Sequence, residues 1–221
     1  PKTKININKW IYFELIKTKK IVEKNIKDYR FDEAARYIYQ FVWHSYCDWY
    51  LELSKTILYS DNKKNVKEIK KMASYIFKEI LILLHPFIPF ITEEIWLKNK
   101  LDNSSKDYLM LANWPDGKIR KDRDTKDVEN LIYIISEIRS FKNELNISPG
   151  SFIDVSLSKI DRKKRDFFKK NETVLKKLGR ISSFLNKDID KPSALLVIKG
   201  NVLKLYFEKS IDLNLIKENL L

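Results

Sequence analysis

The sequence predicts a mainly α protein, in which a helical bundle over residues 1–147 precedes a small α/β module over residues 148–221. Two observations lead to this prediction. Before residue 147, apolar residues recur every three or four positions over long segments, which is the spacing of one buried helix face. After residue 150, the segment FIDVSL alternates between apolar and polar residues, as half-buried strands do, and ISSFL, ALLVI and VLKLYF are short β-rich runs.

The bundle is expected to contain five helices. They are predicted over residues 8–29, 32–59 and 65–84, through Ile91, Ile95 and Trp96, and over residues 125–145. Asp32 is a suitable N-cap for the second of them. Because that second helix carries aromatic residues on nearly every face, we expect it to be buried on several sides at the centre of the bundle. The segment 108–115, which runs into a Trp-Pro-Asp-Gly turn signal, is expected to be extended.

The α/β module is expected to combine short strands with two helices. Strands are predicted over residues 152–157, 181–185, 194–198 and 202–207, and helices over residues 161–178 and 212–221. Lys199, Gly200 and Asn201 separate the last two strands, and this composition predicts a hairpin turn.

Composition excludes several classes of functional site. The four glycines are far apart along the chain, whereas the phosphate-binding loops of nucleotide-binding enzymes need clustered glycines. A single cysteine, Cys47, excludes an internal disulfide bond and a cysteine-based zinc site. Its spacing from His44 suits a packed thiol better than a nucleophile pair, and Glu93 and Glu94 point in different directions on a helix. We therefore expect no catalytic residues, no metal ligands and no enzymatic activity from this chain alone.

The charge balance points to a polyanionic partner. Lys and Arg number 43 against 30 Asp and Glu, so the net charge is +13, which suggests binding to nucleic acid. A general bias of the composition toward Lys, Ile and Asn is the alternative explanation. No apolar stretch approaches the ~20 residues that a membrane span needs. The lack of an apolar leader and the scarcity of cysteine indicate the cytoplasm, and the lack of a starting Met suggests a piece of a larger protein.

Basic residues that could contact phosphate gather at three places. Arg139 and Lys142 lie on the fifth predicted helix, Lys55 lies near the end of the second, and Lys163 and Lys164 open the helix of the α/β module. Arginine suits bidentate contacts with phosphate and stacking on bases, and lysine suits diffuse attraction to phosphate. A solvated, lysine-rich helix face is the alternative for each residue taken alone.

Several motifs follow one another along the bundle. They are RFDEAARYIYQFVWHSYCDWYLELSK (residues 30–55), LLHPFIPFITEEIW (83–96), LANWP (111–115) and EIRSFKNELNISPG (137–150). In sequence and order these motifs resemble the anticodon-binding region of the valyl-tRNA synthetases, which are class I aminoacyl-tRNA synthetases. CDWYLE and HPFIPFITEE favour the valyl enzymes over the isoleucyl and leucyl enzymes. The segment 207–220 is similar to the family's lead into a C-terminal coiled-coil arm.

The resemblance has clear departures. Lys142 stands where the family usually has a second arginine of an Ile-Arg-x-x-Arg helix. The family's catalytic HIGH and KMSKS elements, its editing domain and its coiled-coil arm are missing from this sequence. The letters KKMAS at residues 70–74 are similar to KMSKS, but they fall in the middle of a predicted helix with Met72 on its apolar stripe, where a mobile nucleotide-binding loop would not form.

The resemblance implies the anticodon-binding helical bundle of a class I synthetase, taken from the C-terminal part of a valine–tRNA ligase, with the α/β module leading toward the coiled-coil arm. In such a ligase a catalytic domain uses ATP with Mg²⁺ to attach valine to tRNA(Val). The expected partners are therefore tRNA(Val) and the catalytic and editing domains of the same polypeptide, with no cofactor bound by this chain itself.

The resemblance also directs attention to particular residues. The expected RNA contacts are Glu52, Lys55, Arg139, Lys142, Lys163 and Lys164. Two alternatives stay open. The chain could be a structural module that docks on the catalytic domain and has only non-specific affinity for RNA, or it could be the equivalent domain of an isoleucyl- or leucyl-tRNA synthetase.

Overall fold

The computed structural model describes residues 3–99, 108–115, 117 and 123–207, without the side chains of Lys163 and Asn201. The chain divides into two units, Pro1–Val128 and Glu129–Leu221. The first is helical and the second contains a sheet. The division falls within a helix, earlier than the boundary that we expected at residue 147.

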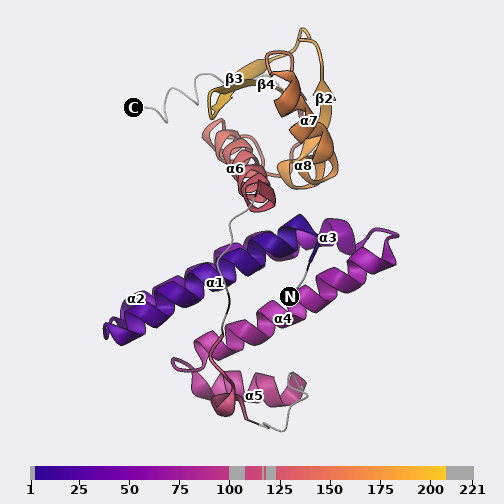
Figure 1. Cartoon of the computed structure of the whole chain (residues 1–221). Coiled ribbons are helices and arrows are strands. Elements are labelled where there is room, and N and C mark those ends of the chain that lie inside the picture. The colour runs from indigo at the N-terminus through magenta and orange to yellow at the C-terminus, as the bar shows by residue number, and fades with distance from the viewer. Residues whose placement is uncertain (1–2, 100–107, 116, 118–122, 208–221) are drawn as a thin grey trace. The chain divides into compact units, whose positions relative to one another are not determined.

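Helices build the first unit (Figure 1). They are α1 (Asn6–Lys27), α2 (Phe31–Gln40), η1 (Phe41–Leu51), α3 (Glu52–Leu58), α4 (Lys63–Leu84), α5 (Pro89–Asn99) and the short 3₁₀ turn η2 (Leu109–Leu111). The predicted helix over residues 32–59 is therefore present as three consecutive pieces, with a π-helix in the middle. Asp32 lies in the first turn of α2 rather than at its N-cap, which is Arg30.

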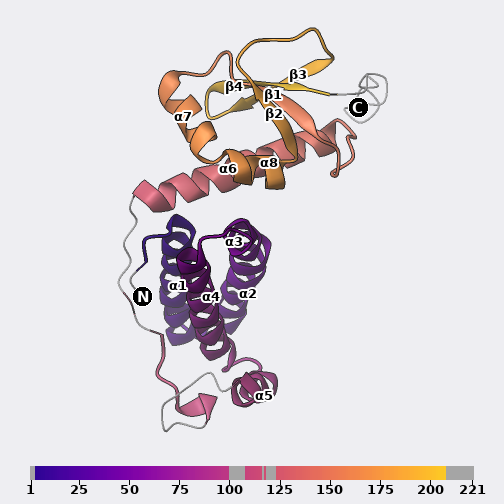
Figure 2. The same ribbon diagram turned by 90° about the vertical axis from the view of Figure 1, so that its right-hand side faces the viewer.

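Figure 2 shows α1, α2 and α4 side by side, and their apolar faces form the core of the first unit. A polar contact ties this core together, because the buried Tyr50 hydroxyl donates a 2.8 Å hydrogen bond to Asn8 Oδ1. The aromatic helix is less enclosed than we expected. Tyr39 and Trp43 are 61% and 53% exposed and their rings stack at 6.3 Å, because this side of α2 and η1 faces away from α1 and α4.

The segment after α5 folds back onto the end of α4. Leu81, Ile82, Trp96 and Leu109 form one buried cluster there. The Leu109 amide donates a 2.8 Å hydrogen bond to the Glu93 carboxylate. The extended conformation expected over residues 108–115 is wrong for Leu109–Leu111, which form the 3₁₀ turn, because packing of Leu109 into the cluster closes the chain locally.

The second unit contains most of α6 (Arg123–Glu144), then β1 (Ile153–Ser156), α7 (Arg162–Lys170), α8 (Glu172–Gly179), β2 (Ile181–Leu185), β3 (Ser193–Ile198) and β4 (Asn201–Tyr206). The strand order is β2-β1-β4-β3, with β1 parallel to β2 and the other pairs antiparallel. The single helix expected over residues 161–178 is interrupted at Asn171, whose side chain bonds back to the Phe167 carbonyl. The helix expected over residues 212–221 lies outside the described residues.

The predicted hairpin is confirmed. Ile198 pairs with Asn201, so a two-residue loop of Lys199 and Gly200 joins β3 to β4. Both loop residues have positive φ, 45° and 73°, as the tightest hairpin turns require. Among the described helices, none is both long enough and apolar enough to cross a bilayer.

Candidate nucleic-acid interface

Helix α4 presents two different faces. Ile69, Met72, Ile76 and Ile80 recur at helical spacing and are buried against the rest of the first unit. Lys63, Lys67, Lys70 and Lys71 occupy the first three turns of the same helix, and all four are exposed. Spacings of four, seven and eight residues bring their side chains to one side of the helix. The amphipathic pattern that buries α4 therefore also aligns these lysines.

The four lysines line a groove together with Leu58, Ser60 and Val66. We call it the lysine groove, and its volume is about 540 Å³. No acidic residue is among its lining residues. Within the described part of the chain, none of the four lysines forms an ion pair with a carboxylate. A cluster of four positive charges without counter-charges attracts a polyanion by releasing that polyanion's counterions.

An exposed aromatic residue lies between two lining residues of the lysine groove in the sequence. Tyr59 follows α3, between the lining residues Leu58 and Ser60, and is 81% exposed. Aromatic rings beside lysines are the combination that single-stranded RNA needs, since bases stack on the ring while lysines attract the phosphates.

Glu52 and Lys55 lie together on α3, one turn before the lysine groove. Their side chains form an exposed ion pair three residues apart. Such surface pairs contribute little to stability, so either partner can exchange its contact for another one at little cost. The predicted contact residues Glu52 and Lys55 are thus accessible. In the sequence they come shortly before Leu58, which lines the lysine groove.

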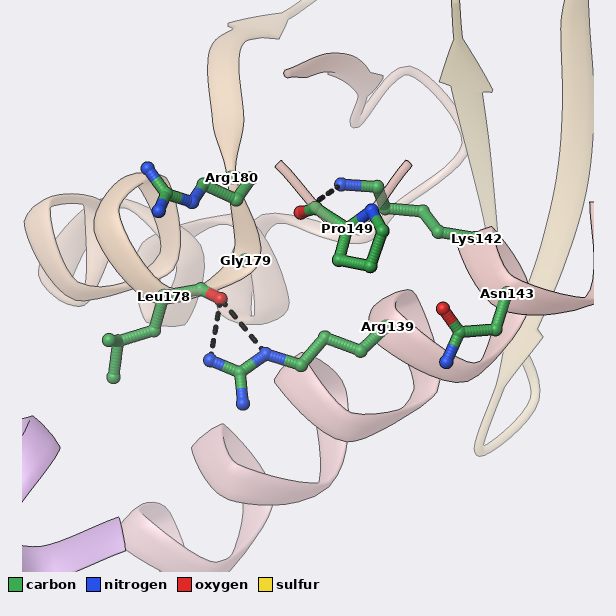
Figure 3. A pocket seen from close by; sticks show the side chains of 7 residues that line it. All are labelled: Arg139, Lys142, Asn143, Pro149, Leu178, Gly179 and Arg180. Atoms are coloured by element: carbon green, nitrogen blue, oxygen red, sulfur yellow. Dashed lines mark hydrogen bonds between the residues drawn. The ribbon is translucent and has the colours of Figure 1, made fainter. Parts of the chain in front are cut away.

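Arg139 and Lys142 meet in a pocket of the second unit, which we call the arginine pocket (Figure 3). Its lining residues are Arg139, Lys142, Asn143, Pro149, Leu178, Gly179 and Arg180, and its volume is about 320 Å³. The Arg139 guanidinium donates hydrogen bonds of 3.1 and 2.9 Å to the Leu178 carbonyl, in the last turn of α8. A cation at this position also complements the negative end of the helix dipole.

Lys142 is only 2% exposed, although the sequence suggested a surface residue. Its ammonium donates hydrogen bonds to the carbonyl oxygens of Pro149 (3.2 Å) and Ser151 (2.6 Å). Burial lowers the pKa of Lys142, and the nearby charges of Arg180 and Arg139 lower it further. Since its polar end is engaged with the loop before β1, Lys142 is poorly placed for direct contact with RNA, and we leave it out of the proposed groove interface.

Lys164 lies on the first turn of α7 and pairs with Asp161 at 3.3 Å, while the Asp161 side chain also caps the helix. The side chain of Lys163 lies outside the described part of the structure. The predicted site residues therefore form separate groups, Glu52 with Lys55 in the first unit and Arg139 with Lys142 in the second, with Lys164 on a different helix of the second unit.

Comparison with known proteins identifies the family of this chain. Residues 8–157 match the family model described as the anticodon-binding domain of tRNA ligase. The chain belongs to this family. Relatives include the valine–tRNA ligases of Pelagibacter ubique (61% identical over 100% of this chain and 25% of that protein), Bartonella quintana (35%; 96% and 24%) and Agrobacterium fabrum (31%; 89% and 21%). The chain thus spans about a quarter of the length of the relatives it matches.

These relatives support the valyl assignment over the isoleucyl and leucyl alternatives. In an anticodon-binding domain the lysine groove is an informative feature, and it was not among the predicted contact residues, because Lys67 belongs to no motif and Lys70 and Lys71 belong to the KKMAS segment that resembles KMSKS. Their spacing from Lys63, on the side opposite the apolar stripe, could have identified the groove. Arg180 was also missed, and no pattern in the sequence marks it.

The sites that the sequence analysis set aside have ordinary surroundings in this anticodon-binding domain. KKMAS lies inside α4 with Met72 buried, as predicted. The His44 imidazole contacts Asp48 at 3.3 Å on the surface. Burial raises the pKa of the Cys47 thiol, with a smaller contribution from Asp48, so its reactive thiolate form is disfavoured. In the described ranges, no three His, Cys, Asp or Glu side chains are grouped to hold a metal ion.

Proposed function

We propose that this chain binds the anticodon arm of tRNA(Val) as part of a valine–tRNA ligase. The observation that carries the proposal is the acid-free lysine groove on a domain that belongs to the anticodon-binding family. The relatives' name supports valine as the amino acid. We assign the ATP- and Mg²⁺-dependent attachment of valine to the rest of the ligase, including its catalytic and editing domains, because the matched family domain is the one that binds the anticodon. The cytoplasm, where tRNA is charged for translation, is the proposed location.

In the proposed complex the lysine groove receives the phosphates of the anticodon loop. Lys63, Lys67, Lys70 and Lys71 attract the backbone, and Tyr59 offers a ring on which an unstacked base lies. Lys55 and Glu52 add a donor and an acceptor for base edges one turn away. Lys163 and Lys164 are proposed as weaker phosphate contacts, and Arg139 contributes through the arginine pocket.

A salt titration tests this function. Binding of the chain is measured with tRNA(Val) and with the same tRNA carrying a changed anticodon, at salt concentrations from 50 to 300 mM. Because lysine–phosphate contacts are independent of sequence, both affinities fall with salt, and anticodon reading appears as a difference that persists at moderate salt. Identical curves would show that the chain binds RNA through its positive charge without reading the anticodon. The absence of measurable binding to either RNA would refute the proposal.

The role of Tyr59 is tested separately. Replacement of Tyr59 by Ala is expected to weaken binding of tRNA(Val) by about 1–3 kcal/mol, the usual contribution of one stacked base. Replacement by Phe keeps the ring and is expected to preserve the affinity. A Tyr59→Ala variant that binds as tightly as the parent chain would show that no base stacks on this ring.

A further inference from the structure

The outer side of α2 and η1 carries a row of exposed apolar residues at helical spacing. Phe31, Ala35, Tyr39 and Trp43 lie four residues apart, and all four are exposed. The Tyr39 and Trp43 rings are parallel to within 3°, with centroids 6.3 Å apart. At the start of the row, the Tyr29 ring meets the Phe31 ring edge-on at 6.3 Å. We call these five residues the apolar row.

The π-helix keeps the apolar row straight. In an α-helix, side chains four residues apart are offset by about 40° around the axis, so a long row at this spacing drifts away from one face. The wider turn of η1 offsets such residues in the opposite sense, so Trp43 stays in line with Tyr39 and the two rings are parallel. π-helical turns are rare and occur frequently at functional sites. Single exposed apolar residues are ordinary, whereas a continuous set of this kind is typical of an interaction surface.

The charge of this region does not suit RNA. Together α2 and η1 contain three acidic residues and one arginine, so their net charge is −2 with His44 neutral, in a chain whose net charge is +13. The single arginine, Arg36, forms an ion pair with Glu33 and lies over the Tyr37 ring. A phosphate backbone therefore finds no net attraction here, in contrast to the lysine groove. A second copy of the chain is also disfavoured, because two molecules that each carry +13 repel one another.

We infer that a helix of the ligase polypeptide, from outside this chain, packs on the apolar row. Residues four apart form the ridges that interdigitate when two helices pack, and the small Ala35 leaves space between Phe31 and Tyr39 for a larger side chain of the partner helix. The chain spans about a quarter of the length of its relatives, so a ligase of their size has ample further sequence to supply this helix. The inference rests on the part of the proposed function that assigns the chain to a valine–tRNA ligase.

Such a helix would also explain the aromatic composition of residues 32–59. That composition predicts a helix buried on several sides, yet Tyr39 and Trp43 are 61% and 53% exposed in this chain. Burial of two large rings is a strong driving force for packing, because each removes a large apolar area from water. The enclosure that the sequence predicts would then be completed by a part of the ligase other than this chain.

Accessibility of the two rings tests the inference. Oxidation of Tyr39 and Trp43 by hydroxyl radicals is measured in the isolated 221-residue chain and in the intact ligase that contains it, both without tRNA. Both residues should react about tenfold more slowly in the intact ligase, because a closely packed helix excludes solvent from them. Tyr59, which is 81% exposed and lies outside the row, is the control and should react equally in the two proteins. Equal rates for Tyr39 and Trp43 in both proteins would overturn the inference.

The same measurement distinguishes the other possible occupants. Addition of tRNA(Val) to the isolated chain should leave the oxidation of Tyr39 and Trp43 unchanged. Slower oxidation with tRNA would make the row an RNA surface. Slower oxidation at higher concentrations of the isolated chain would make it a contact between two copies. Either result would overturn the inference.

A double variant tests the row by its effect on stability. Replacement of both Tyr39 and Trp43 by Gln should lower the thermal midpoint of the intact ligase by a few degrees, because it removes a packed interface. The midpoint of the isolated chain should change much less, since both rings are exposed there. Tyr59→Gln, the matched control, removes an exposed ring outside the row and should change neither midpoint. Equal losses in the ligase and in the isolated chain would contradict the inference.

Failure of this inference can be told apart from failure of the proposed function. If the isolated chain binds tRNA(Val) in the salt titration but Tyr39 and Trp43 are as reactive in the ligase as in the chain, the inference fails and the RNA-binding function stands. If both residues are protected in the ligase but the chain binds no tRNA, the RNA-binding function fails and the apolar row stands as an interface within the ligase.

Discussion

Removal of the four lysine charges is the most discriminating test of the lysine groove. The variant replaces Lys63, Lys67, Lys70 and Lys71 with Gln, which keeps side chains of similar polarity on the exposed face of α4. Each lysine that neutralises a phosphate of single-stranded RNA contributes about 0.7 to the slope of log affinity against log salt. Four contacts therefore contribute about 2.8, which between 50 and 200 mM salt corresponds to about 50-fold in affinity.

The assay is tRNA(Val) binding measured across that salt range for the parent chain and the variant. The parent chain should lose about 50-fold more affinity than the variant between the two salt concentrations. A matched control replaces four exposed lysines of α1 with Gln: Lys17, Lys20, Lys24 and Lys27. Two of these four already pair with glutamates of the same helix, so their contribution should be smaller. Equal changes of slope in both variants would refute a defined groove and leave only diffuse attraction by a basic protein.

Three further predictions concern stability, each measured by urea unfolding. Arg180→Gly should stabilise the second unit by about 1 kcal/mol, because glycine adopts the left-handed region without strain; a loss of stability would show that the arginine is not strained there. Tyr50→Phe should destabilise the first unit by about 1–3 kcal/mol, because the buried Asn8 loses the 2.8 Å hydrogen bond from the tyrosine hydroxyl; a neutral effect would mean that another partner replaces it. Hydrogen bonds from Ser158 and Ser156 lower the pKa of the Asp188 carboxyl from 3.8 to about 2. A carboxyl group whose pKa is lower in the folded state stabilises the fold at pH values above its unfolded pKa, and it loses that effect as the pH falls through its folded pKa. The Asp188→Asn variant should therefore be less stable than the parent chain above about pH 4, and the two stabilities should converge near pH 2. A difference in stability that stays constant across that range would exclude the linkage.

The helices were the most predictable part of the fold, because burial of one face repeats every 3.6 residues regardless of what the helix packs against. The apolar stripe through Ile69, Met72 and Ile76 placed α4 to within two residues at its start, and two β-rich runs separated by turn-forming residues 199–201 placed the β3–β4 hairpin. Predictions were weaker where local signals compete with packing. Leu109–Leu111 were expected to be extended, but the contact of Leu109 with Trp96 favours a 3₁₀ turn.

The candidate site was only partly predictable, because a list of basic residues does not say which of them are accessible. Lys142 and Lys67 both occupy positions on helices among other charged residues. The first is buried against the carbonyls of Pro149 and Ser151, and the second is exposed in the lysine groove. Arg180 lines the arginine pocket with its backbone in a left-handed conformation that its residue type disfavours.

By itself, the sequence determined the helical character of residues 6–58, 63–84 and 123–144, the strands of the smaller module and the family to which the chain belongs, because periodicity and motifs are carried by neighbouring residues. Tertiary structure alone decided which basic residues are buried, which are exposed, and which of them line the same pocket. Electrostatic fields depend on distances through space and on burial, and residues such as Lys142 and Arg180, 38 positions apart in the printed numbering, become neighbours only when α6 and the end of α8 line the same pocket.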